Sequence, residues 1–416
     1  MTETIIQAPT VAPSASPDRS SVPGPPGDEV IAELIAEIHK IGPLLRENAV
    51  EADKNRVLPD SSIEALEATD AFRISALRRY GGYEGGAKML LEVARAIATY
   101  DPAAAWVTVI SNGSVMLANR YDDELLDEVF ADSPVRMASI FASPQGHAVA
   151  EAEGWRVSGE WPFASNSMHS EWAIGILRVS DGEASEPRIG FALMQRGEYT
   201  VKDTWFTIGM RGTGSNTMVA EDLWIPRNRI ISFEQLMGQG PEKDAQTTFG
   251  RRLTPHLTMS TTIQAPALGA AEAALAYVSD LSTKRGITYT TYQRQVDSSA
   301  FVQGLGAAAM KIDGAYLQLR RSAEEIDAAA SGTDPMPLVD RAKNRGGIGH
   351  AGHELVDAVN DLCWLHGTAA FAERSLLGRL WRDVNTGTRH ASIAAPMGYE
   401  LHGDGLTGID FISSKL

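Results

Sequence analysis

The sequence contains only one cysteine and no long apolar run. Cys363 is the single cysteine among 416 residues, so no disulfide can form within the chain. Its neighbours Leu362 and Trp364 are apolar, which predicts a buried and inert thiol, because a reactive thiol needs an accessible, electropositive setting. No stretch approaches the roughly 18 apolar residues that cross a bilayer, so the sequence predicts no transmembrane helix.

Basic residues are also scarce relative to acidic ones. The chain has 37 Lys and Arg against 53 Asp and Glu, a formal net charge of −16. This excess of negative charge argues against nucleic acid or an anionic membrane as a partner. Residues 1–27 are rich in Pro, Ser, Thr and Ala and lack the basic start and apolar stretch of a secretory signal. We therefore expect a disordered tail there and a soluble, cytoplasmic protein.

What is present is a change of pattern along the chain. In residues 28–134, apolar residues such as Leu34 and Ile38 recur every three or four positions, which predicts helices. Residues 135–232 contain strand-like stretches separated by polar turns. Helical spacing returns in residues 233–416. This order predicts an α+β fold, mainly α, with a helical domain, a β-rich domain and a four-helix-like C-terminal domain.

Three motifs occur in order along this pattern. Residues 157–166 read Val-Ser-Gly-Glu-Trp-Pro-Phe-Ala-Ser-Asn, residues 205–216 read Trp-Phe-Thr-Ile-Gly-Met-Arg-Gly-Thr-Gly-Ser-Asn, and residues 378–384 read Gly-Arg-Leu-Trp-Arg-Asp-Val, with His390 shortly after. The ordered set resembles enzymes of the acyl-CoA dehydrogenase fold, and most closely their two-component, reduced-flavin-using monooxygenases. That group includes the oxygenase component of hydroxyphenylacetate hydroxylase, aromatic polyketide hydroxylases and dibenzothiophene monooxygenase. The resemblance extends over nearly all of residues 28–416.

The resemblance implies a fold, an assembly and partners. It implies an N-terminal helical domain, a central β-barrel domain and a C-terminal four-helix bundle. It also implies a homotetramer, since the flavin site of this fold lies partly between subunits. Reduced FMN or FAD would come from a separate flavin reductase, because the chain carries no dinucleotide-binding fingerprint of its own. The other reactants would be O2 and a small organic substrate.

The resemblance further implies which residues bind the flavin. Ser165 matches the hydroxyl beside flavin N5, and Phe163 matches the residue that packs on the ring. The further candidates for cofactor binding are Trp161, Arg211, Thr213, Ser215 and, across a subunit interface, Arg285. Other interpretations stay open: the aromatic residues as core, Ser165 as a turn hydroxyl, Arg211 as a buried structural cation, and the Gly-rich run at 212–215 as a tight turn.

The implied reaction inserts one oxygen atom into the substrate through a flavin C4a-hydroperoxide. His390 is the candidate proton donor, because imidazole titrates in the useful range. Ser143 matches a loop that faces the flavin and the substrate, and Trp106 matches a tryptophan that lines the substrate pocket. Several phenol hydroxylases carry a histidine shortly after that tryptophan, where this chain offers only Asn112 or Ser114. This departure argues against a simple phenol and leaves larger aromatics, polyketides, indoles and amines open.

Three alternative functions remain. An acyl-CoA dehydrogenase needs a glutamate base, yet Glu400 lacks the Gly-Thr that should follow it and residues 257–260 hold no carboxylate. An N-oxygenase of an amine or amino sugar would share the flavin chemistry. A flavin-free binding protein would not be expected to retain Ser165 and His390. A metal site is not predicted, because His350 and His353 lack the i, i+4 spacing and the further ligands of a zinc helix.

Overall fold

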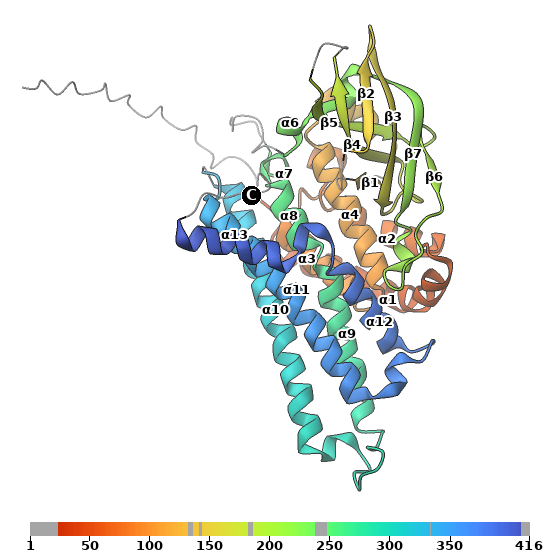
Figure 1. Ribbon diagram of the computed structural model, residues 1–416, viewed down its shortest axis with the longest axis vertical. Coiled ribbons are helices and arrows are strands. Elements are labelled where there is room, and N and C mark those ends of the chain that lie inside the picture. Colours follow the sequence, from red (N-terminus) through yellow and green to blue (C-terminus); the bar gives the residue numbers. More distant parts are fainter. Residues whose placement is uncertain are drawn as a thin grey trace, which may run out of the picture.

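The computed structural model describes residues 24–131, 136–140, 144–181, 186–237, 248–332 and 334–408. Helices come first, a β-sheet follows, and long helices complete the chain, so that the sheet lies at one end of the molecule and the long helices extend toward the other (Figure 1). Most of the predicted tail, residues 1–23, and Ser143 lie outside the described residues.

The N-terminal helices surround one helix that is buried along its whole length. They are α1 (Asp28–Asn55), α2 (Asp60–Ala68), α3 (Ala87–Ala98), α4 (Pro102–Ala118) and α5 (Asp123–Val129). Every residue of α4 is buried, as expected for a helix that is apolar on all sides. The Asp101 side chain begins α4 by accepting a hydrogen bond from the Ala103 backbone N–H at 2.9 Å, and Pro102 fits the first turn.

The strands form one mixed sheet. They are β1 (Met137–Ile140), β2 (Gly146–Ala150), β3 (Gly154–Ala164), β4 (Trp172–Ser180), β5 (Arg188–Gln195), β6 (Thr200–Lys202), β7 (Asn216–Pro226) and β8 (Ile230–Ser232). The hydrogen-bonded order is β6-β7-β3-β2-β4-β5-β8, and β1 pairs with β4. Within the described residues this path ends at β6 and β8, so the predicted barrel is not closed by hydrogen bonds. Both end strands have only three residues, which limits the pairing they can offer.

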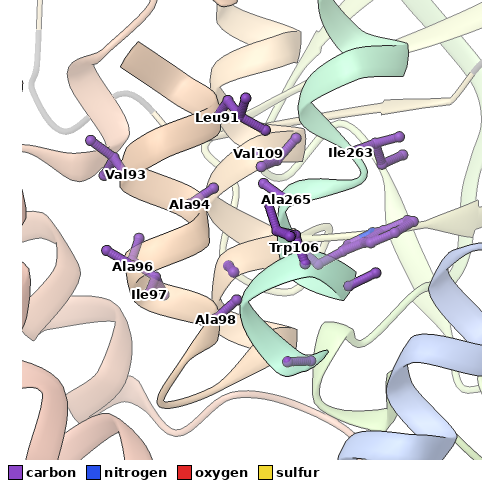
Figure 2. Packing of buried hydrophobic residues seen from close by; sticks show 14 of the residues in the cluster. Leu91, Val93, Ala94, Ala96, Ile97, Ala98, Trp106, Val109, Ile263 and Ala265 are labelled. Carbon is purple, nitrogen blue, oxygen red and sulfur yellow. The ribbon is translucent and has the colours of Figure 1, made fainter. Parts of the chain in front are cut away.

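The C-terminal helices pack against the N-terminal ones rather than standing apart. Three short helices, α6 (Phe233–Met237), α7 (Phe249–Arg252) and α8 (Pro255–Thr262), lead into α9 (Ala265–Ser282), α10 (Ser299–Ser331), α11 (Leu338–His366), α12 (Leu376–Gly387) and α13 (Ala395–Thr407). One hydrophobic core runs from Ile31 to Ile393 through α3, α4 and α9, and the sheet builds a second core. In Figure 2, residues of α3 and α4 and the start of α9 meet in the first core. No helix in the described parts of the chain is long and apolar enough to cross a membrane.

Candidate active site

Four polar side chains from three distant segments form one buried chain of hydrogen bonds. The Trp106 indole N–H on α4 donates to the Ser165 hydroxyl at 3.1 Å. The Ser165 and Ser215 oxygens lie 2.6 Å apart, and the Ser215 and Thr213 oxygens lie 2.7 Å apart. The Thr213 hydroxyl in turn donates to the Met210 carbonyl at 2.8 Å. The structure therefore brings together four residues that the motifs predicted only one by one.

A bulge in β3 sets the position of Ser165 and exposes Phe163. The register between β3 and β7 shifts between Trp161 and Ala164, so one extra residue is accommodated there. Phe163 adopts a φ of +63°, an uncommon conformation for a bulky residue that points to a functional constraint. Its side chain is 63% exposed, and its ring meets the Trp205 ring edge-on at 6.1 Å. An exposed aromatic face thus lies beside the buried Ser165 hydroxyl.

The segment before Thr213 is held against α12. The Arg382 guanidinium donates to the Ile208 carbonyl at 2.6 Å, and the Met210 backbone N–H donates to the Asp383 carboxylate at 2.6 Å. Gly209 fits between them, because a Cβ there would lie 2.1 Å from the Arg382 carbonyl oxygen. We name this contact between residues 207–211 and α12 the α12 clasp. It connects the third sequence motif to the second.

Buried charges surround the α12 clasp. Arg382 also pairs with Asp53 on α1 at 2.7 Å. Asp383 is only 6% exposed, and this burial, together with the nearby Asp101, raises the pKa of the Asp383 carboxyl to about 7. Burial likewise raises the pKa of Asp101 to about 6. Arg379, close to both acids, opposes these shifts. Asp101 begins the helix that carries Trp106, so one buried charge cluster joins α4 to α12.

His390 lies on the other side of Trp106. The two ring centroids are 5.9 Å apart. The Ser392 backbone N–H and the Ser392 hydroxyl approach Nδ1 at 3.2 and 2.8 Å. A backbone N–H can only donate, so Nδ1 accepts and the proton of the neutral ring sits on Nε2.

His390 is neutral near pH 7. Although the residue is exposed, desolvation lowers the pKa of His390 to about 4. Nearby protein atoms disfavour a positive charge on the ring even where one face of it meets solvent. A neutral imidazole with its N–H on Nε2 is therefore the form available for chemistry.

Arg211 has a structural position. Its Nε donates to the Asp53 carbonyl at 2.5 Å and its Nη1 donates to the Thr207 carbonyl at 2.8 Å. Asp53 is also the partner of Arg382, so Arg211 ties the Gly-rich segment to α1. The sequence left two interpretations of Arg211 open, a buried structural cation and a cofactor-binding residue. These contacts favour the structural cation.

Three predicted residues have side chains engaged elsewhere. Trp161 is fully buried in the sheet core, and its indole N–H donates to the Ile176 carbonyl at 2.6 Å. Asn112 donates to the Ala71 and Thr108 carbonyls at 2.8 and 3.0 Å and accepts from the Ser75 N–H at 2.9 Å. Ser114 donates to the Ile110 carbonyl at 2.7 Å and lies 2.8 Å from the Ser139 hydroxyl. Their polar atoms are thus satisfied by the protein itself.

Arg285 lies at the far end of α9. That helix begins beside Trp106, as Figure 2 shows for Ala265, and at about 1.5 Å per residue its other end is roughly 25 Å away. There the Arg285 guanidinium contacts the His366 ring at 3.1 Å. Arg285 therefore does not join the hydroxyl cluster of its own chain.

Two contributors were not predicted as site residues: Asp383 and Trp205. Both belong to the recognised motifs; Asp383 has its partner in a distant segment, whereas Trp205 bonds to a backbone group of its own segment. Trp205 donates from its indole N–H to the Met210 carbonyl at 3.0 Å, and Asp383 accepts from the Met210 N–H. The signal that could have found them was their place within the second and third motifs, at positions 205 and 383.

The residues present fit a flavin ring. An isoalloxazine needs an apolar surface for its face and polar groups at its edge. Phe163 and Trp205 supply the aromatic surface, and Ser165 supplies a buried hydroxyl next to it. Bulged, strained backbone beside this hydroxyl is a common feature of ligand sites.

Neither carboxylate position of a dehydrogenase contributes to this cluster. Residues 257–260 lie on α8, where the Ser260 hydroxyl faces the Ser392 carbonyl at 3.4 Å without any acid nearby in that stretch. Glu400 is exposed on α13. In the described part of the chain, no three His, Cys, Asp or Glu side chains gather in a way that could hold a metal ion.

Several known proteins resemble this chain in sequence and in fold. Residues 261–395 match the family model described as acyl-CoA dehydrogenase, C-terminal domain. The chain is 27% identical to the flavin-dependent monooxygenase oxygenase subunit HsaA of Mycobacterium tuberculosis, over 89% of this chain and 94% of that protein. It is 26% identical to the oxygenase component of an FADH2-dependent resorcinol hydroxylase of Rhizobium, over 90% of this chain and 94% of that protein.

A solved structure extends the match to higher identity. The structure of XiaF from Streptomyces, in complex with FADH2 and glycerol, is 36% identical with a TM-score of 0.90 and covers 93% of this chain and 98% of XiaF. Such identity over nearly the full length of both chains shows the family. The chain belongs to the flavin-dependent monooxygenases of the acyl-CoA dehydrogenase fold, as the oxygenase component of a two-component enzyme that uses reduced flavin.

Proposed function

We propose that this oxygenase inserts one atom of O2 into an aromatic or polyketide-like substrate held beside Trp106 and His390. The observation that carries the proposal is the adjacency of His390, Trp106 and Ser165. The His390 and Trp106 ring centroids are 5.9 Å apart, and the Trp106 indole N–H donates to the Ser165 hydroxyl at 3.1 Å. Only the Trp106 indole therefore separates the His390 imidazole, which can handle a proton, from the Ser165 hydroxyl that is proposed to contact the flavin. The substrates named for HsaA-type and resorcinol-hydroxylating relatives are consistent with an aromatic substrate.

The reduced flavin would be held by Ser165 at its polar edge and by Phe163 and Trp205 at its face. We favour FADH2 over reduced FMN, because XiaF contains FADH2 and the resorcinol hydroxylase is named for it. When bound, the reduced flavin supplies the two electrons that activate O2, so that one oxygen atom enters the substrate and the other leaves as water. A separate flavin reductase would deliver it.

His390 would handle a proton at the reacting end of the site. In its neutral form, Nε2–H can donate a hydrogen bond to an oxygen while Nδ1 is held by Ser392. This hydrogen bond would polarise the oxygen without a net transfer of the Nε2 proton. Because desolvation holds its pKa near 4, His390 would perform this role without first becoming a cation at neutral pH.

The substrate pocket is proposed to be mainly apolar. The Asn112 amide and the Ser114 hydroxyl already donate to backbone carbonyls, so they offer little to a substrate hydroxyl. Polar recognition would then rest on His390. This composition supports a larger ring system bound through its apolar surface, rather than a simple phenol that needs a second polar anchor.

We further propose a homotetramer. Several large apolar side chains of the long helices and the segment after α11 are at least 48% exposed: Val302, Met310, Leu317, Trp364 and Phe371. Val302, Met310 and Leu317 are seven or eight residues apart and so share one face of α10. Contiguous exposed apolar surface of this kind favours burial against another copy of the chain. Arg285, far from the Ser165 of its own chain, could then contact a flavin phosphate held by a neighbouring copy.

The experiment combines the purified protein with a general flavin reductase, NADH, FAD and ¹⁸O2. Resorcinol, a steroid-derived phenol, an indole, a polycyclic polyketide and an aryl amine serve as substrates. We expect a product that gains one ¹⁸O atom on carbon from an aromatic substrate. Exclusive oxygenation of the amine nitrogen would favour the N-oxygenase. Electron transfer from an acyl-CoA to an artificial acceptor, with no oxygenated product, would overturn the proposal in favour of a dehydrogenase.

A further inference from the structure

The buried hydroxyls next to Ser165 have a defined hydrogen-bond direction. A serine or threonine hydroxyl has one proton to give and lone pairs to accept with. At one end of the chain the Met210 carbonyl can only accept, so the Thr213 proton is committed to it at 2.8 Å. The 2.7 Å contact between Thr213 and Ser215 then requires the Ser215 proton.

The same reasoning determines the direction of the hydrogen bonds at Ser165. With the Ser215 proton used, the 2.6 Å contact between Ser215 and Ser165 requires the Ser165 proton. At the other end, the Trp106 indole N–H can only donate, and it donates to Ser165 at 3.1 Å. Ser165 is therefore left without a free proton but with one free lone pair, and its residue is 7% exposed. Each hydroxyl in the chain is oriented by its neighbour.

We infer that Thr213 and Ser215 are positioning residues that hold Ser165 as a hydrogen-bond acceptor, and that this selects reduced over oxidised flavin. The inference rests on the proposed function, in which Ser165 contacts flavin N5. Reduced flavin carries a hydrogen on N5 and needs an acceptor there, whereas oxidised flavin has a lone pair on N5 and needs a donor. A serine whose proton is committed elsewhere satisfies the first form and leaves the second unsatisfied.

Such selection suits an oxygenase whose flavin arrives reduced and must leave oxidised. An acceptor at Ser165 pairs with the N5 hydrogen of reduced flavin. The same acceptor is repelled by the N5 lone pair of oxidised flavin and leaves a buried group unpaired. The free energy of one hydrogen bond, about 0.5–1.5 kcal/mol, corresponds to roughly a 2- to 13-fold ratio of dissociation constants. The directed chain thus contributes a modest but measurable preference.

Thr213→Val is the informative variant. It removes the hydroxyl that commits the Ser215 proton, so the Ser165 proton becomes free to turn toward the flavin. The Met210 carbonyl is not left unpaired, because it still accepts from the Trp205 indole at 3.0 Å and from the Thr213 backbone N–H at 3.2 Å. Thr213→Ser keeps the hydroxyl and should behave as wild type. Thr207→Val is the matched control, since it removes another side-chain hydrogen bond of the same segment, the one to the Gly209 carbonyl at 2.9 Å, and leaves all three hydroxyls intact.

The test measures dissociation constants for oxidised FAD in air and for reduced FAD under anaerobic conditions, for wild type and variants. We expect the oxidised-to-reduced ratio of dissociation constants to fall about 3- to 10-fold in Thr213→Val and Ser215→Ala, and to stay unchanged in Thr213→Ser and Thr207→Val. Melting curves establish that each variant is folded.

The outcomes separate the inference from the proposed function. If wild type binds reduced FAD and Ser165→Ala weakens that binding, but Thr213→Val and Ser215→Ala keep the wild-type ratio, the directed chain is wrong while the function survives. If the ratio falls equally in Thr207→Val, loop disruption explains it and the inference fails. If wild type binds neither FAD nor FMN in reduced form, the proposed function itself fails.

Discussion

At the residue scale, the position of one proton on His390 determines what this side chain can do. Nδ1 is occupied by Ser392, and desolvation keeps the ring uncharged, so Nε2–H is the group it can present. The sequence motif suggested a proton donor on the basis of an ordinary imidazole that titrates near neutral pH. The surroundings change that expectation: the useful form is a neutral donor, and its charge state should be constant across the physiological range.

Replacing His390 by Ala should reduce product formation about 100-fold or more and raise hydrogen peroxide release, because the substrate loses its proton-handling group. Product and peroxide are quantified together with a substrate identified from the panel. The matched control is Arg389→Ala, since Arg389 is the exposed neighbour that contacts only Asn385. Between pH 6 and 8 the wild-type rate should show no titration with the ordinary pKa of histidine, and unchanged coupling in His390→Ala would remove it from this role.

Individual residues also show the limit of prediction from sequence. Ser165, Thr213, Ser215 and Trp106 could be proposed from motifs, and they do lie together. Asn112 was proposed from residue type at a matching position, yet its amide is used by the Ala71 and Thr108 carbonyls. Which backbone groups lie within reach of a polar side chain depends on the packing of distant segments. These partners of a polar side chain cannot be predicted from the pattern of a single sequence.

At the element scale, the α12 clasp connects the flavin-facing segment to the helix that leads to His390. Met210 donates its N–H to Asp383 and accepts at its carbonyl from Thr213 and Trp205. A single residue, Met210, therefore joins α12 to the hydroxyl cluster. The three motifs were recognisable in sequence, but the contact between the second and third was not, because it joins a backbone N–H to a carboxylate 173 residues away.

Gly209→Ala should loosen the α12 clasp. A Cβ would lie 2.1 Å from the Arg382 carbonyl and 2.5 Å from the Thr386 hydroxyl, so the segment or the helix must move. We expect a loss of about 1–3 kcal/mol in unfolding free energy and weaker binding of reduced FAD, read from denaturant melts and anaerobic titration. Gly306→Ala on α10 is the control, since nothing lies within 4 Å of its added methyl group. Equal behaviour of the two variants would contradict a close contact at Gly209.

Asp383→Asn should flatten the dependence of stability on pH. Burial raises the pKa of Asp383 to about 7, so the folded state binds a proton that the unfolded state, with a pKa near 4, has already lost. Its contribution is therefore fully present below about pH 4 and is lost as pH rises toward 7. Asn keeps an acceptor for Met210 but cannot ionise. The fall in melting temperature from pH 5 to pH 7 should be smaller in the variant, and an identical fall would contradict the raised pKa.

At the scale of the whole molecule, the order of helical and strand regions could be read from periodicity. Within the described residues, the strands form one mixed sheet whose hydrogen-bonded path runs from β6 to β8. Closure depends on whether end strands meet in space, and alternation within a strand says nothing about that. The N- and C-terminal helices also share one core through α3, α4 and α9, which a linear division of the chain does not reveal.

The proposed assembly makes a prediction about α10. Met310 and Leu317 are 67% and 57% exposed on one face of the helix, and replacing both by Glu would place charges inside a subunit interface. We expect the mass in solution, measured by light scattering, to fall from a tetramer to a dimer or monomer. Val50→Glu on α1, where the side chain is 65% exposed, serves as the control for added charge. A monomeric wild type, or an unchanged mass in the double variant, would place the interface elsewhere or remove it.

The most direct test of the central claim follows flavin reoxidation in a stopped-flow spectrometer. Protein loaded anaerobically with reduced FAD is mixed with oxygenated buffer, and the appearance of the oxidised-flavin absorbance is compared with that of free reduced FAD. If the chain is an oxygenase that encloses reduced flavin beside Ser165, the protein should delay this absorbance, and Ser165→Ala should shorten the delay. A trace that superimposes on that of free flavin, for both FAD and FMN, would contradict the account.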